Sequence, residues 1–204
     1  MAITTYAELQ TAVGNWADRT DLTDRIPEFI ALAEARFNRV IRAPDMLTRN
    51  DSFTVDSQYE TLPTGFLEAK RFVILTSPVT VLEYLSPEEI AEVRNTHSSA
   101  GKPVYYSVIG GNFEFLPTPG QAYTASILYY AQLTAVSSSF NWLATSHPDI
   151  YLFGALLEAE PFIRNDERIQ VWQTRLDRAL SELHLMNEHK KVPGTARPRT
   201  GGFE

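Results

Sequence analysis

The chain has 204 residues, 44% of them hydrophobic, and a formal net charge of −7. Such a composition allows one sizeable core with an appended subdomain and excludes a disordered protein. The absence of cysteine excludes disulfides and Cys-ligated metal sites, and the negative charge disfavours a protein that wraps nucleic acid through a basic surface.

The first part of the chain predicts two helices, each with one apolar side. Thr5 and Glu8 have the spacing of a capping box at the start of the first helix. The second helix is expected from about Thr23 to Arg42, because its apolar residues recur at a spacing of three and four. Pro27 falls in its first turn, where proline is tolerated.

From about Asn50 the apolar pattern changes from helical to alternating, which predicts strands. Ser86 and Glu89 form a second capping box and start a short helix among them. The clearest hairpin runs from Val104 to Leu116 around Gly110-Gly111, because glycines tolerate the positive φ angles of a tight turn. The other strands are expected at 52–56, 59–62, 69–75, 79–85 and 123–133.

Two more amphipathic helices are expected between His147 and Lys191. Ser146 is expected to cap the first of them. Pro161 predicts a break near Glu160, because a proline inside a helix removes a hydrogen bond and crowds the preceding turn. The second helix restarts at Asn165 or Asp166 and carries an apolar stripe that includes Trp172.

These elements predict an α+β protein. A helical bundle body formed by residues 1–49 and 136–192 receives an inserted antiparallel β subdomain, residues 50–135, that includes one short helix. Residues 193–204 lack periodicity and are expected to form an extended tail. The segment from Lys190 onward has a side-chain balance of +3, so residues 1–189 carry −10.

The sequence contains no catalytic pattern that we recognise, which predicts that the protein is not an enzyme and binds no metal or cofactor. Its four histidines form no His-Glu-x-x-His arrangement. Gly110-Gly111 lies between strands and does not open a helix, as a phosphate-binding loop would. The acidic pair Glu88-Glu89 lies in a helix first turn, where the helix dipole alone accounts for it.

Tyrosines are frequent in the β segment, and two interpretations of them stay open. Such residues stack on sugars or single-stranded nucleic acid in some proteins, but tyrosine is also a good strand former. Interleaved basic residues, which nucleic-acid binding would need, are missing. The tyrosines concerned are Tyr59, Tyr84, Tyr105, Tyr106, Tyr123, Tyr129 and Tyr130.

Three blocks of the sequence together resemble the head-to-tail adaptor proteins of tailed bacteriophages. They are the opening from Tyr6 to Trp16, the helix from Arg25 to Arg36, and the block from Asp149 to Phe162. The Tyr59-Glu60-Thr61-Leu62-Pro63 element and the Val104 to Leu116 hairpin are similar to the inserted sheet of the same family.

The resemblance implies a structural protein of the virion neck, made in the host cytoplasm. Such adaptors form a ring, usually of twelve identical subunits, beneath the portal protein. The ring joins the capsid to a downstream stopper or tail protein and leaves a channel through which double-stranded DNA passes non-specifically. The alternative is a binding module whose tyrosine-rich sheet holds a glycan or another tail component.

Four residues are candidates for docking to the portal or to a neighbouring subunit. Arg197, Arg199 and Phe203 lie in the basic tail, which is expected to become ordered on contact with a partner. Trp172 lies in the last helix and is expected either in the core or between subunits. No apolar run approaches the ~20 residues of a membrane span, and the N-terminus lacks the pattern of a secretory signal, so no membrane partner is expected.

Overall fold

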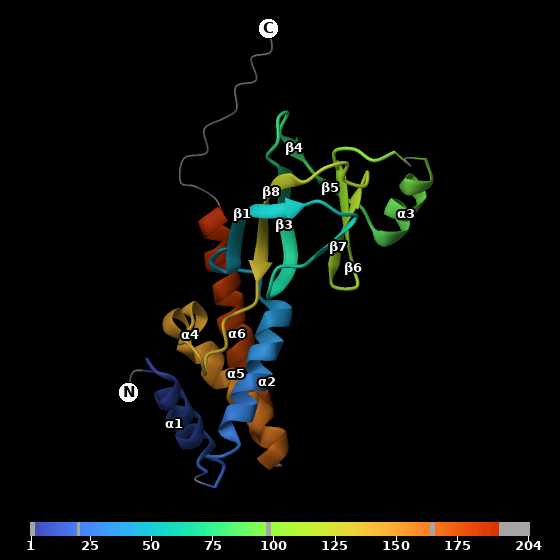
Figure 1. Cartoon of the computed structure of the whole chain (residues 1–204). Helices are drawn as coiled ribbons and strands as arrows, with labels where there is room; N and C mark the ends of the chain where they lie inside the picture. Colours follow the sequence, from blue (N-terminus) through green and yellow to red (C-terminus); the bar gives the residue numbers. More distant parts are fainter. Residues whose placement is uncertain (1–2, 20, 97–98, 164–165, 192–204) are drawn as a thin grey trace. The chain divides into compact units, whose positions relative to one another are not determined.

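The computed structural model describes residues 3–19, 21–96, 99–163 and 166–191 (Figure 1). Contacts divide the chain into two compact units, which we call the helical unit, up to Asp45 and from Leu133, and the sandwich unit, Met46–Gln132. The N- and C-terminal helices pack together, and two four-stranded sheets are inserted between them in sequence. The expected α+β class is therefore confirmed.

The helical unit is built around one central apolar helix. It contains α1 (Tyr6–Ala17), α2 (Ile26–Val40), α4 (Trp142–Ser146), α5 (Pro148–Ile163) and α6 (Asp166–Lys191). Helix α5 contacts the other four, and Figure 1 shows α2, α5 and α6 running alongside one another. A helix with neighbours on several sides needs apolar residues all round, and most of α5 is indeed buried.

Local signals explain only some of the helix ends. The Thr5–Glu8 capping box is present at α1. Helix α5 continues past Pro161 to Ile163, so the break expected near Glu160 does not occur there, and α6 begins at Asp166. The expected cap at Ser146 was wrong, because this residue ends a short helix, α4, that the periodicity did not predict.

A carboxylate fixes the segment through which the chain returns from the strands to the helices. Glu34 Oε1, on α2, accepts hydrogen bonds from Val136 N at 3.0 Å, Asn141 Nδ2 at 3.3 Å and Tyr151 OH at 2.7 Å. Burial raises the pKa of Glu34, because removal from water disfavours the charged form. The three donors hold segment 133–141 against α2 and α5.

The sandwich unit contains two sheets of four strands. The first has the order β1-β8-β3-β4, with β1 at Leu47–Val55, β8 at Tyr123–Ala131, β3 at Phe66–Ile74 and β4 at Thr80–Val81. The second has the order β2-β7-β6-β5, with β2 at Tyr59–Thr61, β7 at Asn112–Leu116, β6 at Tyr105–Ile109 and β5 at Glu83–Tyr84. A 3₁₀ turn, Pro44–Met46, leads into β1.

The predicted hairpin is confirmed and supplies the centre of the second sheet. Strands β6 and β7 pair in antiparallel register, and the two turn residues Gly110 and Gly111 have φ angles of 56° and 82°. Both angles lie in the left-handed region, which a two-residue turn of this kind requires.

Aromatic side chains hold the two sheets together. Phe72, from the first sheet, lies 5.1 Å from Phe113 and 5.4 Å from Phe115 of the second, measured between ring centroids. All three are fully buried. Edge-to-face pairs at this separation stabilise a core beyond the burial of their area.

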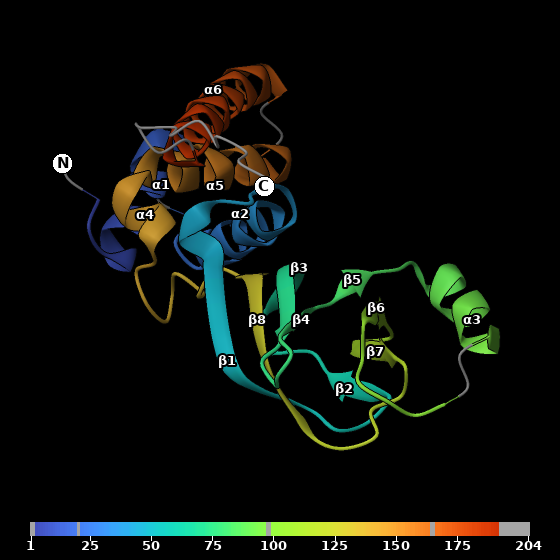
Figure 2. The same cartoon turned by 90° about the horizontal axis from the view of Figure 1, so that it is seen from above.

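Helix α3 (Pro87–Thr96) covers the other face of the second sheet. Figure 2 shows the order first sheet, second sheet, α3. Its Ser86–Glu89 capping bonds are present. Arg94 anchors the helix by donating from Nη2 to Glu114 Oε1 at 2.7 Å and to Phe115 O at 3.0 Å. Helix α3 and the first sheet therefore form opposite outer layers of the sandwich unit.

Candidate docking site on the first sheet

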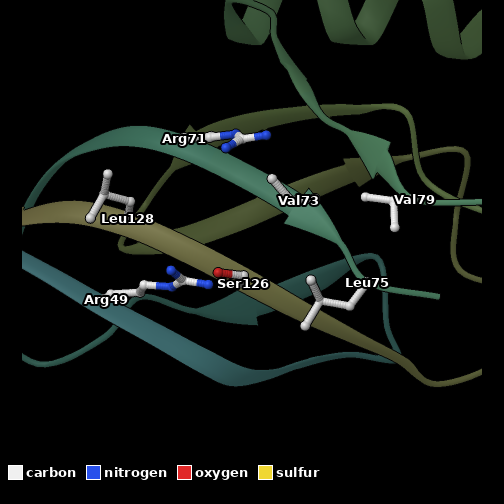
Figure 3. Close-up of a pocket in the computed structure, with 7 residues that line it drawn as sticks. All are labelled: Arg49, Arg71, Val73, Leu75, Val79, Ser126 and Leu128. Atoms are coloured by element: carbon white, nitrogen blue, oxygen red, sulfur yellow. The ribbon is translucent and has the colours of Figure 1, made fainter.

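The outer face of the first sheet places two arginines on either side of a leucine. Leu128, on the middle strand β8, pairs with Arg49 of β1 on one side and with Arg71 of β3 on the other. Its neighbours Ile127 and Tyr129 belong to the core between the sheets, so alternation turns Leu128 outward. Figure 3 shows this row of three side chains.

Only one of the two arginines has an acidic partner among the described residues. Arg49 Nε donates to Asp51 Oδ1 at 2.7 Å, and the Ser126 hydroxyl donates to the same oxygen. These bonds, chiefly the one from Ser126, lower the pKa of Asp51 because they favour the charged carboxylate. Arg71 is exposed and has no hydrogen bond or ion pair with any residue in the described part of the chain. This face thus carries a surplus of positive charge.

Aliphatic side chains complete a shallow pocket beside the arginines (Figure 3). Val73 forms its floor, and Leu75 and Val79 are exposed at its rim, Val79 by 64%. Its volume of about 250 Å³ is below the roughly 300–1,000 Å³ of small-molecule sites. We call the set of Arg49, Arg71, Val73, Leu75, Val79, Ser126 and Leu128 the arginine pocket.

A third cation lies next to the rim of the pocket. Lys102 Nζ donates to Thr76 O at 2.7 Å and also to Pro78 O, so it holds the turn that leads to Val79. Arg49, Arg71 and Lys102 therefore lie in or beside the arginine pocket of a protein whose net charge is −7. This arrangement suits a partner surface that carries carboxylates and a small apolar contact.

Trp172, the predicted docking residue on α6, is buried within the helical unit. Its Nε1 donates to Glu160 Oε1 at 2.7 Å, and its ring stacks on Phe153 with an interplanar angle of 13°. Trp16 packs edge-on against it and is itself 44% exposed. The geometry gives Trp172 a packing role in its own chain, and a role in docking stays a prediction.

The other three predicted docking residues, Arg197, Arg199 and Phe203, lie outside the described residues. Their role in docking also stays a prediction. Sequence reasoning missed the arginine pocket because its residues come from four segments that only the strand pairing brings together. The sequence by itself shows only one arginine in each of two stretches that alternate between apolar and polar residues, and this pattern is too common to identify a site.

Two further kinds of site are absent from the described residues. No group of three or more histidine, aspartate or glutamate side chains is arranged to hold a metal ion. Among those same residues, no helix combines the length and the apolar character needed to cross a membrane.

Comparison with known proteins places the chain in a family. No curated protein matches it. A family model described as SU10 adaptor protein matches residues 4–199, which is nearly the whole chain. The match covers the whole sandwich unit, and the helical unit from residue 4 to residue 199. The chain therefore belongs to the SU10 adaptor protein family, whose members are adaptor proteins of phage virions.

Proposed function

We propose that this phage adaptor forms a ring of identical subunits, twelve in number, beneath the portal protein in the neck of the virion. The ring joins the capsid to a downstream stopper or tail protein and surrounds the channel through which double-stranded DNA passes. The observation that carries the proposal is the family match over residues 4–199. A structural role follows from membership of an adaptor family.

The charge of the chain supports a channel that does not hold DNA. Residues 1–189 carry a net charge of −10, and residues 190–204 carry +3, which gives the total of −7. Binding to DNA phosphates depends on Lys and Arg side chains that neutralise the DNA backbone. An acidic wall repels the phosphates, so DNA moves past it without lasting contacts. Lys190 Nζ pairs with Asp45 Oδ2 at 2.6 Å, so we assign the contact with a protein partner to the basic residues Arg197 and Arg199.

The tail supplies the contact with the portal in this proposal. Arg197 and Arg199 would form charge-assisted hydrogen bonds with carboxylates of the portal, and Phe203 would fill an apolar pocket. Deletion of residues 193–204 tests this part separately. Portal binding should be lost while the deleted chain keeps its thermal stability, and unchanged portal binding would refute the role of the tail.

Electron microscopy of the protein mixed with purified portal tests the main proposal. We expect rings attached to one end of the portal, with a central channel. Images that contain only free monomers beside bare portals, at micromolar concentrations of both proteins, would refute it.

The alternative, a tyrosine-rich sheet that binds a glycan, loses support from the burial of its residues. Tyr106, Tyr123, Tyr129 and Tyr130 are buried. The two exposed rings, Tyr59 at 51% and Tyr84 at 52%, lie on β2 and β5, the opposite edges of the second sheet. Stacking platforms need adjacent exposed rings, and these tyrosines mostly build the core instead.

A further inference from the structure

The outer side of α3 carries acidic groups without partners. Glu88 and Glu92 are exposed and are separated by one helical turn, with the exposed Ala91 next to them. Neither carboxylate has a hydrogen bond or ion pair with a residue that the structure describes. Like charges at this spacing destabilise a helix slightly, so a cationic partner would relieve a local cost.

This acidic face is held rigidly on the sandwich unit. Ile90, on the opposite side of α3, is fully buried, and Arg94 ties the helix to Glu114 and Phe115 of β7. A rigid helix loses little conformational freedom on binding, which favours its use as a docking element.

We propose that neighbouring copies of the adaptor associate by packing the outer face of α3 of one copy into the arginine pocket of the next. This inference specifies the contact between subunits of the ring proposed above, and it rests on that proposal. Glu92 pairs with Arg71, Glu88 lies toward Arg49, which is already paired with Asp51, and Ala91 lies against Leu128. Arg71 and Glu92, which have no partner among the residues described in their own chain, are of opposite sign, so the contact pairs them.

The spacing of the charges on the two surfaces is compatible. Arg49 and Arg71 lie on strands separated by one strand, which puts their backbones about 10 Å apart. Residues four apart on a helix are separated by about 6 Å, and the long arginine side chains can close the difference. Ala91, between the acids in the helix, leaves room for the backbone of α3 to approach the aliphatic floor of the pocket.

The positions of the two surfaces favour a ring over a closed pair. Helix α3 and the arginine pocket lie on opposite outer layers of the sandwich unit (Figure 2). A contact between two different patches is head-to-tail, and such contacts generate rings when the rotation closes. A twofold dimer would instead use the same patch on both copies.

Charge reversal in the full-length protein tests this interface. Arg71→Glu and Glu92→Arg should each weaken self-association at least about tenfold, since like charges that face each other across an interface cost several kcal/mol. The combined variant, Arg71→Glu with Glu92→Arg, should recover most of the loss. Self-association is measured by mass photometry, and rings on the portal by electron microscopy.

Three controls make the result specific. Arg39→Glu makes the same charge change at an exposed position on α2 of the helical unit and should leave self-association within about twofold of wild type. Thermal unfolding of each variant identifies any loss of folding. Arg71→Gln, which removes the charge without reversing it, should give a smaller loss than Arg71→Glu.

The outcomes separate this inference from the proposed function. Rings formed by wild type and equally well by Arg71→Glu would overturn the α3 contact and leave the ring intact. A combined variant no better than the worse single variant would also overturn it. Normal rings with weaker retention of linear double-stranded DNA in Arg71→Glu would assign the pocket to phosphate instead. Wild-type protein that forms no ring, with or without portal, would refute both proposals.

Discussion

Removing the hydrogen bond from Trp172 to Glu160 tests how the helical unit is stabilised. Glu160 is 1% exposed, Trp172 Nε1 lies 2.7 Å from its Oε1, and its Oε2 has no hydrogen-bond partner among the described residues. Trp172→Phe keeps an aromatic ring beside Phe153 but removes the N–H donor. The buried carboxylate then loses its partner and keeps its desolvation cost.

The expected loss in the free energy of unfolding is about 2 kcal/mol, because a hydrogen bond to a charged group contributes roughly 1.5–3 kcal/mol. For a chain of this size the unfolding midpoint should fall by about 4–8 °C. Replacing both partners by apolar groups removes the unsatisfied carboxylate. The double variant Trp172→Phe with Glu160→Leu should therefore be more stable than Trp172→Phe alone.

Urea unfolding followed by circular dichroism measures these differences. A loss below about 0.5 kcal/mol for Trp172→Phe, or a double variant less stable than the single one, would refute the reasoning. Assembly with the portal provides the second readout. If assembly weakens in proportion to stability, Trp172 acts through the core of its own chain, and if assembly weakens more, the docking role is supported.

Three further changes test the packing, the electrostatics and the turn. Gly154→Ala should lower the free energy of unfolding in urea by about 1 kcal/mol, because the added Cβ would lie 2.5 Å from Phe37 Cζ. Overpacking costs about 1–3 kcal/mol, which exceeds the roughly 1 kcal/mol gained in helix propensity. A variant more stable than wild type would contradict this prediction. Burial raises the pKa of Glu34 above its ordinary value of 4.5, so its contribution to stability is present below pH 4.5 and is lost as pH rises through the raised pKa. The stability of Glu34→Gln relative to wild type should therefore improve as pH rises across this window. Thermal-stability curves of the two proteins that run parallel over this pH range would contradict the prediction. Gly110→Ala should cost about 1 kcal/mol because of the φ angle of 56°, and Gly110→Asn, measured alongside it, should cost less.

Much of the fold was predictable from neighbours in the sequence. The capping boxes at Thr5 and Ser86 and the Gly110-Gly111 turn were identified correctly because each depends on residues within a few positions of one another. The change of apolar period near Asn50 likewise separated the helical part of the chain from the strands, since side-chain periodicity differs between helix and strand. Helix α4 was missed because its five residues are too few to establish a period.

What the sequence by itself determined is therefore the type, order and approximate ends of the elements. The tertiary structure decided which side chains meet. The strand order put Arg49 and Arg71 on either side of Leu128, and the stacking of the two sheets buried Tyr106, Tyr123 and Tyr129 in the core. The physical reason is that periodicity indicates only whether a side chain faces the apolar core or the solvent. The side chains that it contacts in the core come from strands and helices distant in the chain.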